Sequence, residues 1–211
     1  DENNGGGWEQ ELEGLWIGKY EASRSDATNS SDGLATTIKV QPNIRSFRST
    51  KIGDMYNYAI SYSEDLKSHM LKNSEWGAAA YLTDSKYGRN GTEVTINNNS
   101  NYITGQAGDS ISAIESTTTN LYNTSKGVLA SSTGNVYGLY DLSGGLLEYL
   151  ASYYKDGNQT YLDSGNSFTA DKTSDEYSTV YEGKVKESNY KYGDATLETY
   201  AWNNDYANFD Y

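Results

Sequence analysis

The chain has 211 residues, and its 16 lysines and arginines against 29 aspartates and glutamates give a formal net charge of −13 at pH 7. This excess of negative charge repels a nucleic-acid phosphate backbone and anionic lipid headgroups, so we expect no nucleic acid among its partners. No apolar run approaches the roughly 20 residues of a membrane-spanning helix, so we expect no direct insertion of this segment into a membrane.

The chain contains no cysteine and one histidine. These counts exclude disulfides, a thiolate nucleophile and any metal site built from cysteines or several histidines. The 21 tyrosines and four tryptophans supply large faces that can be buried in a core. Abundant Asn, Ser, Thr, Gly and Tyr are typical of exported bacterial surface proteins, so we expect an extracellular or cell-surface location.

Residues 1–13 begin with a polar, glycine-rich stretch and are interpreted as a linker or frayed terminus, and residues 14–211 as a single domain. The pattern at residues 15–20 predicts a short buried strand, and residues 37–40 a second one. Pro42, the only proline, then opens a turn.

Two helices are expected next. Apolar residues at helical spacing predict the first over residues 51–67. The second begins with Asn73 as cap and Glu75 in its first turn, and Gly88 ends it. The residues expected on the buried faces of the two helices are Ile52, Tyr56, Ala59, Ile60, Trp76, Ala79, Ala80 and Tyr87.

Beyond Gly91, clusters of Gly, Asn, Ser and Thr separate short apolar pieces, a pattern typical of extended loops. Residues 102–105 and 127–130 are the expected points at which these loops reach the core. The fold class predicted from these patterns is α+β, with two helices, short strands and long irregular loops.

Three stretches resemble one known family: GLWIGKYE at residues 14–21, the helix around Trp76, and the motif at residues 137–149. They are similar to the formylglycine-generating, sulfatase-modifying-factor family. The resemblance is closer to an exported bacterial branch of this fold, through residues 69–88 and 134–150. This branch is related to the variable, ligand-binding proteins of diversity-generating retroelements, and residues 193–196 and 202–209 match it as well. The resemblance implies a C-type-lectin-like domain.

The enzymes of this family use cysteines near their C-terminus to hold copper and carry out the oxidation. Because this chain has no cysteine, formylglycine-generating activity is not expected, and no enzyme activity is predicted. In the family, further strands that close the central sheet follow the last matching piece. The chain ends at Tyr211 before them, so we expect a domain that is incomplete at its C-terminus.

Family members also hold structural calcium, which prefers carboxylate, amide and backbone oxygens. Glu148 is kept from that motif, but Gly145 stands where the family has asparagine, so calcium at Glu148 is only a weak expectation and no other cofactor is predicted. His69 and Asp141 are more simply structural, with His69 in hydrogen bonds and Asp141 capping a loop. The Ser143-Gly144-Gly145 stretch is interpreted as a turn.

Tyrosine and asparagine cluster late in the chain, and such residues are frequent on recognition surfaces. The leading hypothesis is therefore a non-catalytic, surface-displayed adhesin or receptor-binding domain that recognises a protein or glycan through its loops. An alternative is a structural subunit that assembles into an extracellular filament or pilus, and a further one a phage receptor-binding component. The predicted ligand-binding residues are Trp202, Asn203, Asn204, Tyr206 and Asn208.

Overall fold

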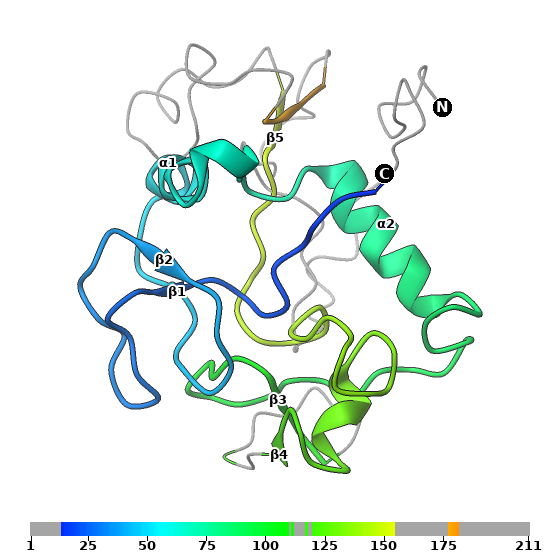
Figure 1. Ribbon diagram of the computed structural model, residues 1–211. Helices are drawn as coiled ribbons and strands as arrows, with labels where there is room; N and C mark the ends of the chain where they lie inside the picture. The colour runs from blue at the N-terminus through cyan, green and yellow to red at the C-terminus, as the bar shows by residue number, and fades with distance from the viewer. Residues whose placement is uncertain (1–13, 110, 112–116, 118–119, 155–176, 182–211) are drawn as a thin grey trace, which may run out of the picture.

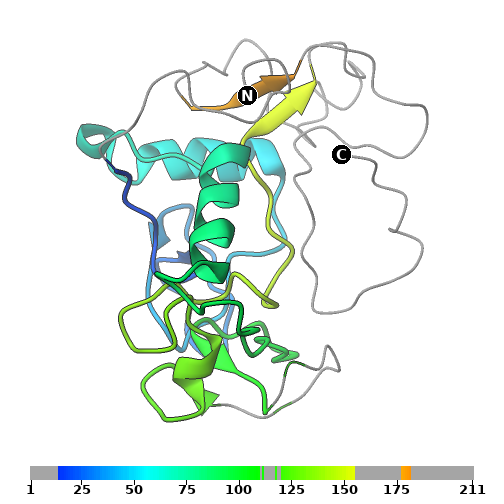
Figure 2. The same cartoon turned by 90° about the vertical axis from the view of Figure 1, so that its right-hand side faces the viewer.

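The computed structural model describes residues 14–109, 111, 117, 120–154 and 177–181 (Figure 1). Its regular structure consists of two α-helices, two 3-10 turns and short strands joined by long loops, which confirms the predicted α+β class. The helix α1 (Ile52–Ser61) and β5 (Ser152–Tyr154) lie at one end of the molecule, and β3 (Gln106–Ala107) and β4 (Asn120–Leu121) lie at the opposite end (Figures 1 and 2).

The strands of the described residues form three separate pairs. β1 (Ser23–Arg24) runs antiparallel to β2 (Ile38–Lys39), and β3 runs antiparallel to β4. β5 runs parallel to β6 (Thr179–Tyr181). The strand expected at residues 37–40 is therefore confirmed as β2.

The strand expected at residues 15–20 is wrong. This segment has no strand pairing; Trp16 is fully exposed, and of its residues only Tyr20 is buried. One backbone hydrogen bond, from Tyr140 N–H to Lys19 O at 2.9 Å, and the Lys19 side chain connect it to residues 136–140. The apolar run therefore contacts residues 136–140 through Lys19 and does not pair as a strand in a sheet.

The first predicted helix divides into two parts. α1 buries Ile52 and Tyr56, as its spacing predicted, and ends at Ser61, whereas Glu64–Leu66 forms a separate 3-10 turn, η2. The Ser68 hydroxyl donates to the Ala59 carbonyl oxygen at 2.7 Å and accepts the Ser63 N–H at 2.8 Å. These bonds replace the next helical turn, so the helix stops short of the predicted residue 67.

The second helix, α2 (Asn73–Asp84), begins at Asn73 rather than after it. The cap residue is Lys72, whose N–H donates to the Glu75 carboxylate at 2.8 Å, so Glu75 takes the role predicted for Asn73. Ala79 is buried as expected, but Tyr87 lies beyond the helix end and is exposed. Among the described residues, no helix is long and apolar enough to cross a membrane.

Within the part of the chain that the structure describes, two small apolar clusters form the core. One combines α1 with the end of the long loop region and contains Ile52, Tyr56, Met70 and Ala151. The other contains Tyr20, Ala107, Ala130 and Tyr140. Both expected anchor regions contribute buried side chains, with Ile103 from residues 102–105 and Ala130 from the 3-10 turn η3 (Gly127–Ala130).

Candidate functional site

The motif at residues 137–149, here called the late motif, contains two acidic residues. The more enclosed one is Asp141, which is 1% exposed. Its carboxylate accepts the Gly105 N–H at 2.9 Å on both oxygens, the Asn97 amide at 2.9 Å and the Glu21 N–H at 3.3 Å. Its φ of 65° is a left-handed conformation that aspartate and asparagine adopt more readily than most residues. The loop-capping interpretation of Asp141 is confirmed, and the residue joins three separate loops.

Asn97 extends this network to the glycine turn. Its side-chain amide also donates to Ile103 O at 2.8 Å, and its carbonyl oxygen accepts the Gly145 N–H at 2.7 Å. Gly144 and Gly145 have φ values of 82° and 77°, which only glycine adopts at little cost. The predicted turn at residues 143–145 is therefore present, and it docks against Asn97.

Glu21, from the first motif, reaches the same turn from the other side. Its carboxylate accepts the Leu146 N–H at 3.0 Å and the hydroxyl of the buried Ser46. A Cβ added at Gly145 would lie 2.5 Å from Glu21 Oε1. The early motif and the late motif thus meet at Glu21 and Gly145, and glycine is required there by both φ and space.

The helix motif joins the late motif through Trp76 and Glu148. The Trp76 indole N–H donates to Glu148 Oε2. A second tie is the Ala151 N–H, which donates to Leu71 O at 2.8 Å just before α2 begins. All three stretches that carried the family resemblance therefore converge on one polar region, which we call the acid hub (Glu21, Asn97, Asp141 and Glu148).

The acid hub brings three carboxyl groups together, with Asp141 buried and Glu21 and Glu148 partly buried. Burial raises the pKa of Glu21 well above its usual range, and the neighbouring Asp141 and Glu148 raise it further. Burial also raises the pKa of Asp141, to about 6, although the N–H donors of Asn97, Gly105 and Glu21 act in the opposite direction. The hub therefore holds carboxyl groups that become easier to protonate when the chain folds.

His69 is a structural residue, as expected. Its Nδ1 lies 2.7 Å from Lys67 O and its Nε2 lies 3.1 Å from both Glu75 carboxylate oxygens. The hydrogen bond that the His69 ring donates to the Glu75 carboxylate raises the pKa of His69 despite partial burial. This pair fixes the entry to α2.

The family resemblance implies calcium near Glu148, and this stays a prediction. Glu148 already accepts the Trp76 indole N–H, and an asparagine at position 145 would collide with Glu21. In the part of the chain that the structure describes, no group of three or more His, Asp or Glu side chains is arranged to hold a metal ion.

A cluster of tyrosines around Lys19 was missed in the sequence. The Lys19 ammonium lies 5.4, 5.3 and 5.8 Å from the ring centroids of Tyr20, Tyr122 and Tyr140, and donates to Val136 O. The Tyr20 and Tyr140 rings are stacked, and Tyr122 meets both edge-on. No local pattern signals this cluster, because Tyr122 and Tyr140 lie about a hundred residues or more after Lys19.

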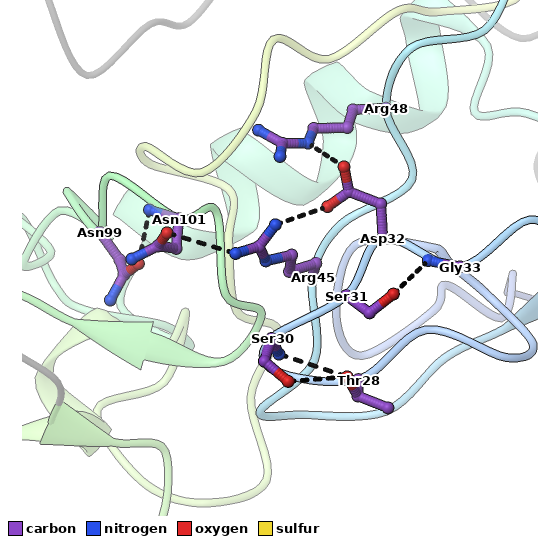
Figure 3. Close-up of polar contacts among 9 residues, drawn as sticks. All are labelled: Thr28, Ser30, Ser31, Asp32, Gly33, Arg45, Arg48, Asn99 and Asn101. Carbon is purple, nitrogen blue, oxygen red and sulfur yellow. Dashed lines mark hydrogen bonds and ion pairs between the residues drawn. The ribbon is translucent and has the colours of Figure 1, made fainter.

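A second unpredicted cluster contains Asp32, Arg45 and Arg48 (Figure 3). Asp32 Oδ1 lies 3.1 Å from Arg45 Nη1, and Asp32 Oδ2 lies 2.9 Å from Arg48 Nε. Arg45 Nη2 lies 3.5 Å from Asn101 Oδ1. The available signal was compositional: three of the four arginines of the chain fall between residues 24 and 48.

The five predicted ligand-binding residues, Trp202, Asn203, Asn204, Tyr206 and Asn208, lie outside the described residues. Within the described part, large exposed side chains include Trp16 and Tyr137, which is 87% exposed. No family model, curated protein or solved structure matches the chain.

Proposed function

We propose that this chain is a non-catalytic, surface-displayed domain that binds a protein or glycan through its loops, on a C-type-lectin-like scaffold. The observation that supports this proposal is the use made of Asp141. Asp141 is 1% exposed and its carboxylate oxygens accept hydrogen bonds from two other loops, so the group has a structural role and no open face for a substrate.

The exposed aromatic side chains favour binding over catalysis. Trp16 and Tyr137 lie outside helices and strands, with their rings largely in solvent. Tyrosine and tryptophan give large contact area at low entropic cost, and asparagine supplies adaptable hydrogen bonds. The residues proposed to make the principal contacts combine these types late in the chain. These are Trp202, Asn203, Asn204, Tyr206 and Asn208.

The test replaces these five residues together with alanine in the full chain and measures binding to protein and glycan arrays and to cells. We expect the ligand detected with the parent chain to be lost while the melting temperature is kept. The control replaces the exposed Tyr81, Leu82 and Tyr87 with alanine, which removes a comparable apolar surface at and just after α2. Unchanged cell attachment of the five-residue variant, with no array ligand for the parent, contradicts the proposal.

The alternative of a filament or pilus subunit predicts a different result. Electron microscopy of the native cell surface would then show the domain at a regular repeat, labelled by an antibody against it. A binder displayed as separate copies gives scattered labelling instead. Neighbouring phage tail genes would indicate the further alternative, a phage receptor-binding component.

A further inference from the structure

Arg45 and Arg48, here called the arginine pair, share the carboxylate of Asp32. Together the three side chains carry a net positive charge on an acidic protein. Three of the four arginines lie in residues 24–48, whereas the chain as a whole carries a net charge of −13. In the pair itself two guanidinium groups share one carboxylate, which leaves one positive charge in excess.

The pair is held in a defined geometry. Arg45 lies in a β-bridge with Ile103, and its N–H donates to Thr28 O at 3.1 Å. Partial burial opposes ionisation of Asp32, but hydrogen bonds from Arg48 and Arg45 lower its pKa, so the carboxylate stays charged and orients both guanidinium groups. Arginine side chains fixed in advance lose less entropy when a ligand binds.

Arg48 keeps donors available for a ligand. Only its Nε bonds to Asp32, and its two terminal nitrogens point away from that carboxylate and donate to no group in the described part of the chain (Figure 3). Its guanidinium carbon lies 5.5 Å from the Tyr102 ring centroid, and the side chain is 30% exposed. Two N–H groups at the end of a guanidinium match the two oxygens of a carboxylate.

Besides the Tyr102 ring, small polar groups lie near the arginine pair. Thr28, Ser30 and Asn101 are exposed, and the Asn101 amide nitrogen can donate beside the oxygen that faces Arg45. Such hydroxyl and amide groups suit the hydroxyls of a sugar better than an apolar peptide side chain. The net charge of −13 disfavours polyanions, so an isolated carboxylate fits better than a sulfated or polymeric acid.

We infer that the arginine pair binds a sugar that carries one carboxylate, such as a uronic or sialic acid, with Arg48 taking the carboxylate and Asn101 a hydroxyl. This inference rests on the proposed binding function and names a ligand class for it. It concerns residues other than the late Trp, Asn and Tyr residues, so the two proposals are tested by different substitutions and can fail independently.

The experiment is an NMR titration of the full chain with glucuronic acid, N-acetylneuraminic acid and glucose. We expect saturable shifts of the Arg48 side-chain N–H with both acids and none with glucose. Arg48→Gln should weaken binding roughly tenfold or more, since a hydrogen-bonded charge pair is lost, and Arg48→Lys should weaken it less. Arg89→Gln is the matched control, because it removes the same charge from the one arginine outside residues 24–48.

The absence of saturable shifts with either acid overturns the inference, as does an equal response to glucose. Saturable binding only of a peptide with a free C-terminal carboxylate overturns it in favour of a protein ligand. An equal loss of binding in Arg89→Gln would show non-specific attraction and would also contradict the inference.

The parent-chain comparison of glucuronic acid with glucose remains decisive even if Arg48→Gln does not fold, and Arg48→Lys keeps the charge. Loss of cell attachment in the five-alanine variant without acid binding leaves the proposed function standing and this inference refuted.

Discussion

Asp141 shows how one buried acid can organise loops that have little secondary structure. Its oxygens accept N–H groups from Asn97 and Gly105, which lie in the loop before β3, and from Glu21 near the start of the chain. Buried donors that lose an acceptor cost more than the hydrogen bond itself contributes, because they are no longer solvated. The residue is therefore expected to matter for folding rather than for a reaction.

Replacing Asp141 with asparagine keeps the left-handed backbone but turns one acceptor into a donor that faces other N–H groups. We expect a loss of about 2–4 kcal/mol in the free energy of unfolding, measured by urea denaturation. Asp26→Asn is the control, since Asp26 also accepts two backbone N–H groups, from Leu34 and Ala35, but at an exposed site. Its loss should be much smaller, and equal losses would contradict the role of burial.

Gly145 stands where the family resemblance inferred from the sequence implies an asparagine. Gly145→Asn restores the family side chain, but its Cβ would lie 2.5 Å from Glu21 Oε1, so we expect a loss of about 1–3 kcal/mol in the free energy of unfolding. Gly91→Asn is the matched control, because Gly91 has φ of 73° and no atom within 4 Å of an added Cβ. Stabilisation of the Gly145 variant by calcium would instead show that a metal site can be formed.

At the scale of elements, α2 is fixed at its N-terminal end rather than along a buried stripe. Glu75 caps it and bonds His69, and Trp76 in its first turn reaches Glu148. Its later turns expose Tyr81 and Leu82. The helix thus depends on polar contacts of its first turn more than on an apolar face.

Trp76→Phe keeps an aromatic ring but removes the indole N–H. We expect the free energy of unfolding to fall by about 1–2 kcal/mol, because a charge-assisted hydrogen bond to a partly buried carboxylate is lost. A double-mutant cycle with Glu148→Gln should show coupling between the two positions, whereas Trp16→Phe at a fully exposed site should change nothing. Additive effects of Trp76→Phe and Glu148→Gln would contradict the contact.

At the scale of the whole molecule, the raised pKa values of Glu21 and Asp141 predict greatest stability in mild acid. A carboxyl group with a raised folded pKa contributes stability below its unfolded value, 4.5 or 3.8 here, and loses it as pH rises through the folded pKa, about 6 for Asp141. Glu75 acts oppositely: although burial would raise its pKa, His69 and Lys72 lower it, so its contribution is lost only below the usual glutamate range.

We therefore expect the urea midpoint to fall as the pH rises from about 4 through about 6, and to fall again below about pH 4. The Glu21→Gln variant should reduce the first slope and leave the acid limb unchanged. A midpoint that rises steadily from mild acid to pH 8 would contradict the enclosed charge of the acid hub.

Local sequence patterns predicted the helices and turns better than the tertiary contacts between them. The spacing at Ile52 and Tyr56 and the turn at Ser143–Gly145 depend on neighbours in sequence, so they could be read directly. The Trp16 segment was misassigned because an apolar run does not reveal whether a pairing strand exists. The Lys19 cluster and the arginine pair join residues that are distant in sequence, and no spacing rule connects them.

The contacts of Glu21 also determine when the chain can fold during its synthesis. Its partners Asp141 and Leu146 lie 120 and 125 residues later in the chain. At ribosomal speed that separation takes on the order of ten seconds, during which the first loop has none of these ties. Contacts of such long range slow folding. The ordered fold is therefore expected to form in one late step, after the motif at residues 137–149 has left the ribosome.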